Sequence, residues 1–517
     1  MSEIDKLKEL MTLNANMNTL EIESRFEHIA QILFSKFAVK KGGQIFLFKD
    51  IEFYFYNQNH KDIITHPRNS EALYWYVNDF GGIDLNMFSS IEPILSSDNK
   101  GKIITKYALN EKACFGGILI RQLIDKDSRE VINGPWACAE LFRCHSAAGY
   151  DRDFPILVEY DNGVVAFERT SRINLLPAGQ TREKKVDNIL SLYLNHPQNK
   201  ELYESFSEFK EKSYRYIRFN DLIHDEYTDT VYLSPWLNDK NVGHSDFYNR
   251  LISLLNEMDI KYETLKHTND YWARDYMPAQ LGDHEFLKYK YNPDYLINSK
   301  NKDDKYTITN VDNVLRGMGI SCRRTELIID GGNMVACGPY IVMTDKVFTE
   351  NNKDKGDISF KIELESIIGH PVIIIPWTMH GDFDAEDTDK YGHADGFIKW
   401  CGDRRILMGN HGDEYPEEAA AIRRILERHG FVVTEMRFND KVTNPCQELN
   451  WAYINFLQVG RNIIMPKFNI EEDGIAYQYV QKSFPHCKIQ QIEMQDIAKE
   501  GGALHCISWN IRSNRPN

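Results

Sequence analysis

The chain has 517 residues, of which 42% are hydrophobic and 26% charged, and its formal net charge at pH 7 is -15. A chain of this length is too long for a single ordinary hydrophobic core, so we expect a soluble protein of two or three domains. The acidic balance argues against a general nucleic-acid binder and suits cationic partners.

The N-terminus and the cysteines indicate the compartment. Residues 1–6 lack the basic start and apolar run of a secretory signal, and no apolar stretch approaches the length needed to span a membrane. The nine cysteines form no CxxC pair, so neither a disulfide framework nor a zinc site is indicated. We therefore expect a cytoplasmic protein with reduced thiols, no bound metal and no membrane partner.

The first part of the chain, residues 1–175, is expected to form a mixed, β-rich domain. Apolar residues at helical spacing predict helices within residues 1–40. Aromatic and β-branched residues predict strands at 44–56, 116–123 and 155–167.

Three short segments of this domain follow one another in a recognisable order. They are the acidic strand 48–54, residues 117–121 and residues 133–141. In order and spacing they resemble landmarks of the alkyladenine-type DNA glycosylases, across about residues 20–175. The resemblance implies that Glu52 is the carboxylate that activates water, although Phe53 stands where that family has a small residue. The alternative for Glu52 is an outward-facing, solvated side chain, and a repurposed relative of the fold is favoured over a working glycosylase.

A charged stretch, residues 176–224, comes next. Its lysines and glutamates are interleaved with apolar residues, which predicts one or two exposed helices that act as a connector. Beyond it, residues 225–517 alternate short apolar strands with amphipathic helices, the pattern of an α/β domain. No Gly-rich phosphate loop follows a strand, so no nucleotide cofactor is expected. Strands are predicted at 230–233, 262–265, 372–375, 406–408 and 431–433, and helices at 246–258 and 416–429.

The last stretch of the chain, residues 500–509, centres on a thiol. Gly501 and Gly502 leave the backbone free to approach a ligand closely, and Cys506 follows them. The segment either presents this thiol to a bound molecule or starts a buried strand, because free cysteines are commonly buried.

Two other segments carry complementary side chains. A loop after a predicted strand contains Trp272, Arg274 and Asp275, which either bind a ligand or simply pack and form ion pairs. Further along the chain, His393 and Asp395 share one face if their segment is a strand, because alternate residues of a strand point the same way. An imidazole and a carboxylate would then face one pocket.

A thiol, an imidazole and two carboxylates suit attack on a guanidinium group. Carboxylates hold its planar fork by charge-assisted hydrogen bonds, a thiolate attacks the central carbon, and a histidine delivers a proton to the departing amine. Carboxylates beside a thiol raise its pKa, so the cationic substrate itself is expected to restore the thiolate. A rival use of acidic residues is a cation site in the loop 382–389. That loop lacks the glycine and final glutamate of a helix-loop-helix calcium site and is more simply solvated.

Five landmarks follow in order between residues 225 and 517. They are Trp272-Ala273-Arg274-Asp275, Asp330-Gly331-Gly332-Asn333, Gly392-His393-Ala394-Asp395, Tyr453-Ile454-Asn455-Phe456 and Gly501-Gly502-Ala503-Leu504-His505-Cys506. Together they resemble the guanidine-modifying enzymes, in the branch that holds agmatine deiminases and bacterial peptidylarginine deiminases. The resemblance implies the pentein fold, a five-bladed α/β propeller with pseudo-fivefold symmetry and a central active site, and it implies no cofactor.

The resemblance also implies a role for each matching residue. Cys506 would be the nucleophile, His393 the general acid and base, and Asp275 and Asp395 the guanidinium clamps. Asp330 stands where many relatives have a longer glutamate that orients the histidine. The family chemistry implies a covalent thiouronium intermediate, release of ammonia and hydrolysis to a ureide.

The same landmarks place Trp272, Arg274, Asp330 and Asn333 at the substrate. The chain departs from the agmatine deiminases after Cys506, where those enzymes usually have a glutamine-rich run. We therefore expect the partner to be a small guanidino compound or an arginine-containing peptide, without choosing between them. No oligomeric state is predicted.

Other functions remain open from the sequence. Within the same fold, amidino transfer or dihydrolysis would use the same residues. In another class, the chain is a guanidinium-binding module, or it acts in DNA base excision through its N-terminal domain. The full set of clamps, histidine and thiol favours an enzyme, because a binding module needs no nucleophile.

Overall fold

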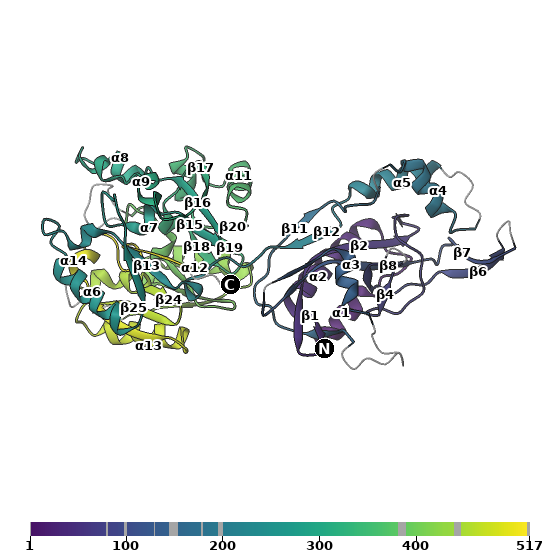
Figure 1. Ribbon diagram of the computed structural model, residues 1–517, viewed down its shortest axis with the longest axis horizontal. Helices are drawn as coiled ribbons and strands as arrows, with labels where there is room; N and C mark the ends of the chain where they lie inside the picture. Colours follow the sequence, from purple (N-terminus) through teal and green to yellow (C-terminus); the bar gives the residue numbers. More distant parts are fainter. Residues whose placement is uncertain are drawn as a thin grey trace. The chain divides into compact units, whose positions relative to one another are not determined.

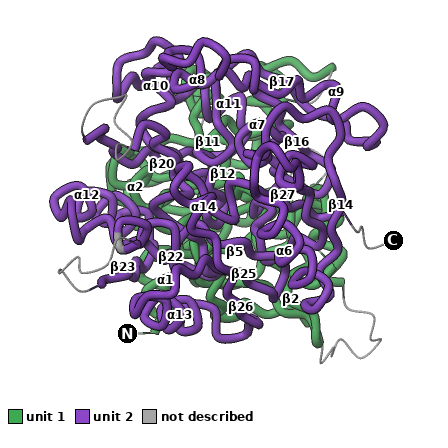
Figure 2. Tube along the Cα trace, turned by 90° about the vertical axis from the view of Figure 1, so that its left-hand side faces the viewer, with its two compact units in different colours: residues 1–219 green, residues 220–517 purple. Residues whose placement is uncertain are grey.

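The computed structural model describes residues 2–78, 81–97, 101–128, 130–143, 154–176, 179–194, 200–380, 389–438 and 446–513. The chain divides into two compact units, Met1–Phe219 and Asn220–Asn517, which Figure 2 draws in different colours. Within the described ranges, no helix is both long and apolar enough to cross a membrane. The described cysteines are all free thiols.

Unit 1 is organised around the long strand β2 (Gln44–Asn57), which lies inside a ten-stranded sheet. Nearly every residue of β2 is buried, and the ring of its Phe53 lies 4.6 Å from that of Phe26 on helix α2 (Thr19–Lys36). The strand order along the sheet is β10-β1-β2-β8-β5-β4. Figure 1 labels β1, β2, β8 and β4 of this order. In this order β2 pairs directly with β1 (Phe37–Lys41) and β8 (Phe115–Asp125). The other strands are β4 (Trp75–Val77), β5 (Ile83–Asn86) and β10 (Ile156–Glu159).

Helices α1 (Glu3–Met11) and α2 open unit 1. In each, the side chain of the N-cap residue, Ser2 or Asn18, accepts a backbone N–H of the first turn, and an acidic side chain accepts the N-cap N–H in return. Such reciprocal capping satisfies donors that the helix leaves unpaired at its start. Both helices bury their apolar faces in the core of unit 1, so the helices predicted within residues 1–40 are confirmed.

The charged segment 176–224 is not an exposed connector. It contains α4 (Arg182–Leu190) and α5 (Lys200–Glu211), whose apolar residues pack with those of β2 and β8 in one buried cluster. The strand β12 (Arg215–Arg218) then pairs with β2 itself. Amphipathic helices bury one face even where their overall composition is highly charged, so composition alone misplaced them at the surface. The remaining elements of unit 1 are β3 (His60–Lys61), β6 (Glu92–Ser97), β7 (Ile103–Ala108), β9 (Val131–Asn133), β11 (Phe167–Thr170) and α3 (Pro135–Glu140).

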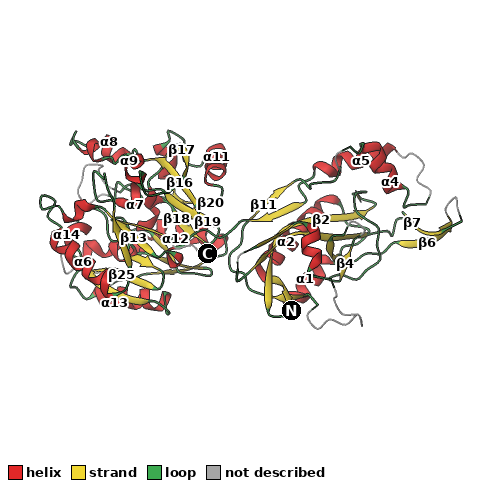
Figure 3. Cartoon of the chain, in the orientation of Figure 1, coloured by secondary structure: helices red, strands yellow, loops and turns green. Residues whose placement is uncertain are grey.

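Unit 2 repeats one pattern in five three-stranded sheets. In each sheet two strands pair antiparallel, and the middle strand pairs in parallel with the third. A parallel pair needs a crossover, so helical segments lie between the second and third strands (Figure 3). The sheets are β27 (Ser508–Ile511), β13 (Thr230–Leu233), β14 (Lys261–Thr264); β15 (Ala279–Gly282), β16 (Glu285–Lys290), β17 (Cys322–Ile328); β18 (Val335–Cys337), β19 (Tyr340–Thr344), β20 (Val372–Ile375); β21 (Ile398–Trp400), β22 (Arg405–Met408), β23 (Val432–Glu435); and β24 (Leu457–Val459), β25 (Asn462–Lys467), β26 (Lys488–Glu493).

The predicted strands and helices of unit 2 are found within one or two residues of their expected bounds. The helix predicted at 416–429 is α12, and Gly430 follows it at φ +87°, a left-handed conformation that favours glycine after a helix. The crossover helices are α6 (Ser245–Glu257), α8 (Asp294–Ile297), α9 (Val311–Leu315), α10 (Lys346–Glu350), α11 (Ile358–Ile368), α12 (Pro416–Arg428) and α13 (Glu472–Ser483), and the 3₁₀ turns outside the site are η1 (Asp225–Tyr227), η2 (Pro235–Asn238), η3 (Asp304–Thr307) and η6 (Asn410–Asp413).

The connections from the third strand of one sheet to the first strand of the next gather in one place. Each contains a short helical turn, and the turns of neighbouring connections touch: α7 contacts η4, η4 contacts η5, and η5 contacts η7. All five sequence landmarks lie on these connections. The turns are α7 (Ala273–Tyr276), η4 (Gly331–Asn333), η5 (Ala394–Gly396), η7 (Gln447–Ile454) and α14 (Gln495–Ala498).

Candidate active site

Cys506 lies on the connection that leads into β27, and its side chain is buried. Its Sγ is 3.8 Å from Oδ2 of Asp395. The backbone fixes it from two other connections: the Cys506 N–H donates to Oδ1 of Asn455, and its carbonyl accepts the N–H of Arg274. The thiol is therefore held beside one of the predicted clamps rather than packed into an ordinary strand core.

His393 and Asp395 do not lie on a strand, contrary to the sequence prediction. They stand at the start of the 3₁₀ turn η5, and β21 begins only after it. The turn forms because Gly392 has φ +59° and because Oδ1 of Asn333 accepts the N–H of Ala394 at 3.2 Å. The prediction that these two side chains share one face of a strand is therefore wrong, and it is the 3₁₀ turn that positions them.

The position of Gly332 shows that the three predicted groups converge. A Cβ atom added there would lie 2.7 Å from Nδ1 of His393, 2.8 Å from Oδ1 of Asp275 and 3.1 Å from Oδ1 of Asp395. The Gly332 N–H itself donates to Asp275 at 3.1 Å. One small volume is thus bordered by an imidazole and two carboxylates, and only glycine leaves it open.

Asp330 reaches His393 despite its short side chain. Its Oδ2 lies 2.9 Å from Nε2 of the ring, and both groups are buried. On the other side of the ring, Nδ1 is 3.4 Å from Oδ1 of Asp275. The nitrogen that faces the shared volume is therefore Nδ1, while Asp330 fixes the ring from behind.

Burial and mutual charge set the protonation of this cluster. Burial lowers the pKa of His393, but the carboxylates of Asp275, Asp330 and Asp395 outweigh it and raise that pKa to about 10. Burial raises the pKa of Asp275 to about 7, with further help from the neighbouring carboxylates. Burial and the two clamps raise the pKa of the Cys506 thiol well above its usual value. The free site therefore holds an imidazolium and a protonated thiol at neutral pH.

The predicted substrate-binding residues have different surroundings. Trp272 covers Gly502, where an added Cβ would come within 2.1 Å of its ring, so it forms a wall at the glycine pair. The side-chain oxygen of Asn333 accepts hydrogen bonds from the backbone N–H groups of Thr344 and Ala394. The guanidinium of Arg274 hydrogen-bonds the side chain of Asn510. Asn333 and Arg274 are thus bound to the protein itself.

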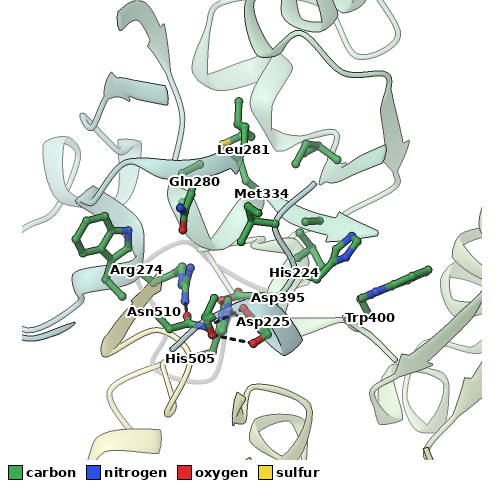
Figure 4. Close-up of a pocket in the computed structure, with 18 of the residues that line it drawn as sticks. His224, Asp225, Arg274, Gln280, Leu281, Met334, Asp395, Trp400, His505 and Asn510 are labelled. Carbon is green, nitrogen blue, oxygen red and sulfur yellow. Dashed lines mark hydrogen bonds and ion pairs between the residues drawn. The ribbon is translucent and has the colours of Figure 1, made fainter. Parts of the chain in front are cut away.

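Arg274 borders a cavity of about 80 Å³. Figure 4 shows Arg274, Asp225, Asp395, His505 and Asn510 close together at one wall of it. Asp395 lies between this cavity and the Cys506 sulfur, because its carboxylate also contacts the thiol. We call this space the Arg274 cavity.

The residues that the sequence argument did not single out are Gly332, Asn455 and His505. Asn455 bridges two connections, because its Oδ1 accepts the Cys506 N–H while its Nδ2 donates to the Asp395 carbonyl at 3.3 Å. His505 contacts Asp395 directly. All three stand inside the quoted landmarks, so their place beside named site residues was the available signal.

No group of three or more His, Cys, Asp or Glu side chains is arranged to hold a metal ion in the part of unit 2 or unit 1 that the structure describes. The cation site considered for the acidic loop 382–389 falls mostly outside the described residues. Only Asp389 of that loop is described, and it accepts the Trp377 ring N–H at 3.1 Å.

Glu52, the candidate base of unit 1, is fully buried on β2 and not outward-facing. Its Oε2 accepts the hydroxyl of Tyr54 at 2.7 Å and the guanidinium of Arg121 at 3.1 Å, and its Oε1 accepts the N–H of Ile173 at 3.0 Å. A carboxylate with three donors suits an ion pair in the core rather than a base that activates water.

A comparison with protein families agrees with the geometry of unit 2. Residues 192–511 match the family model described as Porphyromonas-type peptidyl-arginine deiminase, and this range is more than half of the chain. The chain belongs to this family. The match covers all five connections that carry the site, so the family assignment and the convergence of side chains concern the same residues.

Individual relatives of this family member are distant. A Legionella pneumophila (strain Paris) protein with the provisional name agmatine deiminase is 26% identical over 259 residues, which are 46% of this chain and 72% of that protein. An agmatine deiminase of Ectopseudomonas mendocina (strain ymp) is 24% identical over 215 residues, 36% of this chain and 57% of that protein. The solved structure of a C. jejuni agmatine deiminase with substrate bound is 18% identical, with a TM-score of 0.46, and covers 56% of this chain and 95% of that one.

Proposed function

We propose that unit 2 hydrolyses a guanidinium substrate to a ureide and ammonia through a covalent bond to Cys506. The observation that carries this proposal is the convergence of an imidazole and two carboxylates around the volume beside Gly332, with the Cys506 thiol 3.8 Å from one of those carboxylates. Each group has a task in attack on a planar cation, whereas binding alone would need no nucleophile. The family assignment supports an enzyme that acts on guanidino groups.

The first half-reaction begins with charge. Binding of a cation between Asp275 and Asp395 favours their ionised forms and offsets the negative field that keeps the thiol protonated. The Cys506 thiol releases its proton to bulk water, and the thiolate attacks the central carbon and forms an S–C bond. The imidazolium of His393 donates its proton to one amino nitrogen, the C–N bond breaks, and ammonia leaves a thiouronium on Cys506.

The second half-reaction uses the same histidine in the opposite direction. His393 is now neutral, and it accepts a proton from a water molecule as the oxygen attacks the thiouronium carbon. The tetrahedral intermediate collapses as the S–C bond breaks: the sulfur leaves as a thiolate, the hydroxyl proton of the intermediate passes to bulk water, and the ureide remains. Asp330 holds the ring by its Nε2 throughout, so Nδ1 serves both proton transfers.

We also propose that the five sheets of unit 2 are the blades of the pentein propeller. The support is the repeated order of antiparallel pair, crossover and parallel strand in every sheet, and the pairing of the last strand, β27, with the first, β13. Pairing of the first and last strands within one blade closes a ring of blades, each of which keeps only short edges. The site would then lie where the connections of all five blades meet.

For the substrate, we propose a small guanidino compound, of which agmatine, free arginine derivatives and arginine in a short peptide are the classes to compare. The family description names peptidyl-arginine and the relatives' names include agmatine, and all of these share the guanidinium that the clamps would hold. A reducing compartment such as the cytoplasm suits a thiol nucleophile.

Ammonia release from agmatine, arginine and an arginine peptide tests the proposal. We expect Cys506→Ser to lower kcat by at least roughly a thousandfold, the scale on which a lost nucleophile acts. Cys322→Ser, which alters a half-buried thiol on β17 outside the site, is the matched control and should release ammonia like the unmodified protein. Equal release by Cys506→Ser would reject the nucleophile, and an amine or transferred amidine in place of a ureide would reject deimination.

A further inference from the structure

His505, the residue before the proposed nucleophile, contacts a proposed clamp. Its Nδ1 lies 2.6 Å from Oδ2 of Asp395, and both side chains are buried. The same Oδ2 faces the Cys506 sulfur at 3.8 Å, whereas Oδ1 of Asp395 faces the volume beside Gly332. The two oxygens of Asp395 therefore have different neighbours: His505 contacts Oδ2, whereas Oδ1 is the oxygen nearest that volume.

The groups around His505 keep its ring neutral. Burial, together with the cations Arg274 and Lys399 that also line the Arg274 cavity, outweighs the carboxylate of Asp395 and lowers the pKa of His505 to about 4. Its other nitrogen, Nε2, is 3.8 Å from Asp225, whose carboxylate is already paired with Lys399 at 2.6 Å. A neutral ring beside an ionised carboxylate donates through Nδ1.

This hydrogen bond acts on Asp395 in turn. Burial raises the pKa of Asp395, but the interactions with His505, of which the hydrogen bond is the largest, and then the charges of His393 and Arg274 outweigh it, and the net effect lowers that pKa. The neighbouring clamp, Asp275, has a longer imidazole contact, 3.4 Å to Nδ1 of His393, and burial raises its pKa to about 7. The carboxylate with the closer imidazole contact is thus the one whose pKa is lowered.

We infer that His505 is a positioning residue for deimination, which fixes Asp395 as an ionised clamp by donating Nδ1–H to Oδ2 and thereby directs Oδ1 at the guanidinium. This inference rests on the proposed function of unit 2. The His505 side chain acts on the substrate only through Asp395. Arg274 and Lys399, which line the Arg274 cavity, keep the His505 ring in its neutral form.

Three substitutions at His505 distinguish the effect of a hydrogen-bond donor at the Nδ1 position from the effect of side-chain size. In His505→Asn the amide nitrogen occupies nearly the place of Nδ1, in His505→Gln it reaches toward the place of Nε2, and in His505→Leu there is no donor. We expect His505→Asn to stay within about threefold of the unmodified protein. His505→Leu and His505→Gln should lose about 10- to 100-fold in kcat/KM, the range expected for a lost hydrogen bond to a charged group, mainly through KM.

The pH profile distinguishes positioning from general destabilisation. Without the Nδ1 donor the pKa of Asp395 rises toward that of Asp275, so the acid limb of the kcat/KM profile, which Asp275 alone sets in the unmodified protein, should become steeper below pH 7 in the Leu and Gln variants and stay unchanged in the Asn variant. A loss of packing alone would lower the folded fraction without changing the steepness of that limb. If the Leu variant fails to fold, the comparison of Asn with Gln still decides.

The matched control is His411→Leu, which removes another partly buried imidazole–carboxylate contact, that of His411 Nε2 with Glu418 at 2.7 Å. It should leave kcat/KM and the acid limb unchanged. If the unmodified protein is active, equal effects of the Asn and Gln variants overturn the role of His505 alone. An acid limb that is no steeper in the Gln and Leu variants does the same. An unmodified protein that releases no ammonia from any guanidino compound overturns the proposed function and this inference together.

Discussion

At the scale of single residues, the two clamps of unit 2 differ in protonation although they border the same volume. The pKa of Asp275 is raised to about 7 by burial, whereas that of Asp395 is lowered, and the pKa of His393 is raised to about 10 by the surrounding carboxylates. A productive complex needs both clamps ionised and the imidazole protonated. The window in which this holds lies between the Asp275 and His393 values.

We therefore expect a bell-shaped pH dependence of kcat/KM for ammonia release. Activity should rise as pH increases through about 7, because Asp275 loses its proton, and it should fall as pH increases through about 10, because His393 loses the proton it must donate. Initial rates from pH 5 to 11 at low substrate measure both limbs. In Asp275→Asn the limb near pH 7 should disappear together with most of the activity, and an unchanged limb would contradict the assignment.

Gly332 gives a second prediction at this scale. In Gly332→Ala the new methyl group would lie 2.7 Å from His393 Nδ1 and 2.8 Å from Asp275 Oδ1, in the volume that we assign to the guanidinium. We expect kcat/KM to fall by at least about a hundredfold, since displacement of reacting groups by about 1 Å has effects of this size. Ammonia assays combined with circular dichroism measure activity and folding separately.

The control for this change is Gly474→Ala, because nothing lies within 4 Å of the added methyl and the residue is in helix α13. Alanine in a helix should be neutral or slightly stabilising there. Full activity of Gly332→Ala would show that the guanidinium does not occupy this volume.

At the scale of elements, the strands of unit 2 were predictable because buried strands leave runs of apolar residues. Thr230–Leu233 and Val372–Ile375 were placed by such runs alone, and the structure confirms them as β13 and β20. The turns that carry the site were not predictable in the same way. Their shape depends on contacts with other connections, such as the hydrogen bond from the Ala394 N–H to Oδ1 of Asn333. Such contacts leave no periodic pattern in the local sequence.

The same reasoning explains which site residues were found. Cys506, His393, Asp275 and Asp395 have side chains whose chemistry is visible in the sequence. Asn455 and His505 act on those residues from behind, through bonds to a backbone or to a carboxylate that only the fold brings near. Five landmarks in order therefore predicted the cluster, but not the contacts that hold it.

We expect the connection before β27 to contact the substrate tail, which is the part of the substrate beyond its guanidinium group. Gly501 and Gly502 run against the rings of Tyr391 and Trp272, where added Cβ atoms would come within 2.4 and 2.1 Å of them. Glu500 precedes them with a half-exposed carboxylate, and its carbonyl accepts the Tyr391 hydroxyl at 3.3 Å. The ring of Tyr391 lies 6.3 Å from that of His393, so Tyr391 links the backbone of Glu500 to the site.

We expect Glu500 to favour guanidino compounds whose tail ends in a cation. The side chain is held by His244 at 3.0 Å and by the hydroxyl of Tyr271, so it offers a fixed negative charge. Glu500→Gln should raise KM for agmatine by about two- to fivefold, the range for a partly exposed ion pair, and leave KM for n-butylguanidine unchanged. Parallel measurement of the two substrates checks this, and an equal change for both would contradict a role in tail recognition.

At the scale of the whole molecule, unit 1 carries its own buried charges, and these serve its core. Glu52 on β2 pairs with Arg121 on β8 and also accepts from Tyr54 and Ile173, so one side chain ties two central strands to the segment that follows β11. Burial, with the charge of Glu52, raises the pKa of Tyr54 well above its usual value, which keeps that hydroxyl a donor. This arrangement predicts a structural role for the carboxylate that the glycosylase resemblance would make a base.

We accordingly expect Glu52→Gln to weaken unit 1 and to spare deimination. The amide keeps the shape of the side chain but leaves Arg121 buried without its counter-charge, which should lower the free energy of unfolding by about 3–5 kcal/mol. Urea unfolding of the full chain, followed by circular dichroism and tryptophan fluorescence, measures this loss, and ammonia release should stay unchanged. Glu27→Gln, which removes an exposed ion pair with Arg169, should cost less than about 1 kcal/mol. The opposite result would make Glu52 a catalytic carboxylate. In that case the Glu52→Gln protein would unfold like the unmodified chain but would no longer excise an alkylated base, so the charge would act on a substrate and not on the fold.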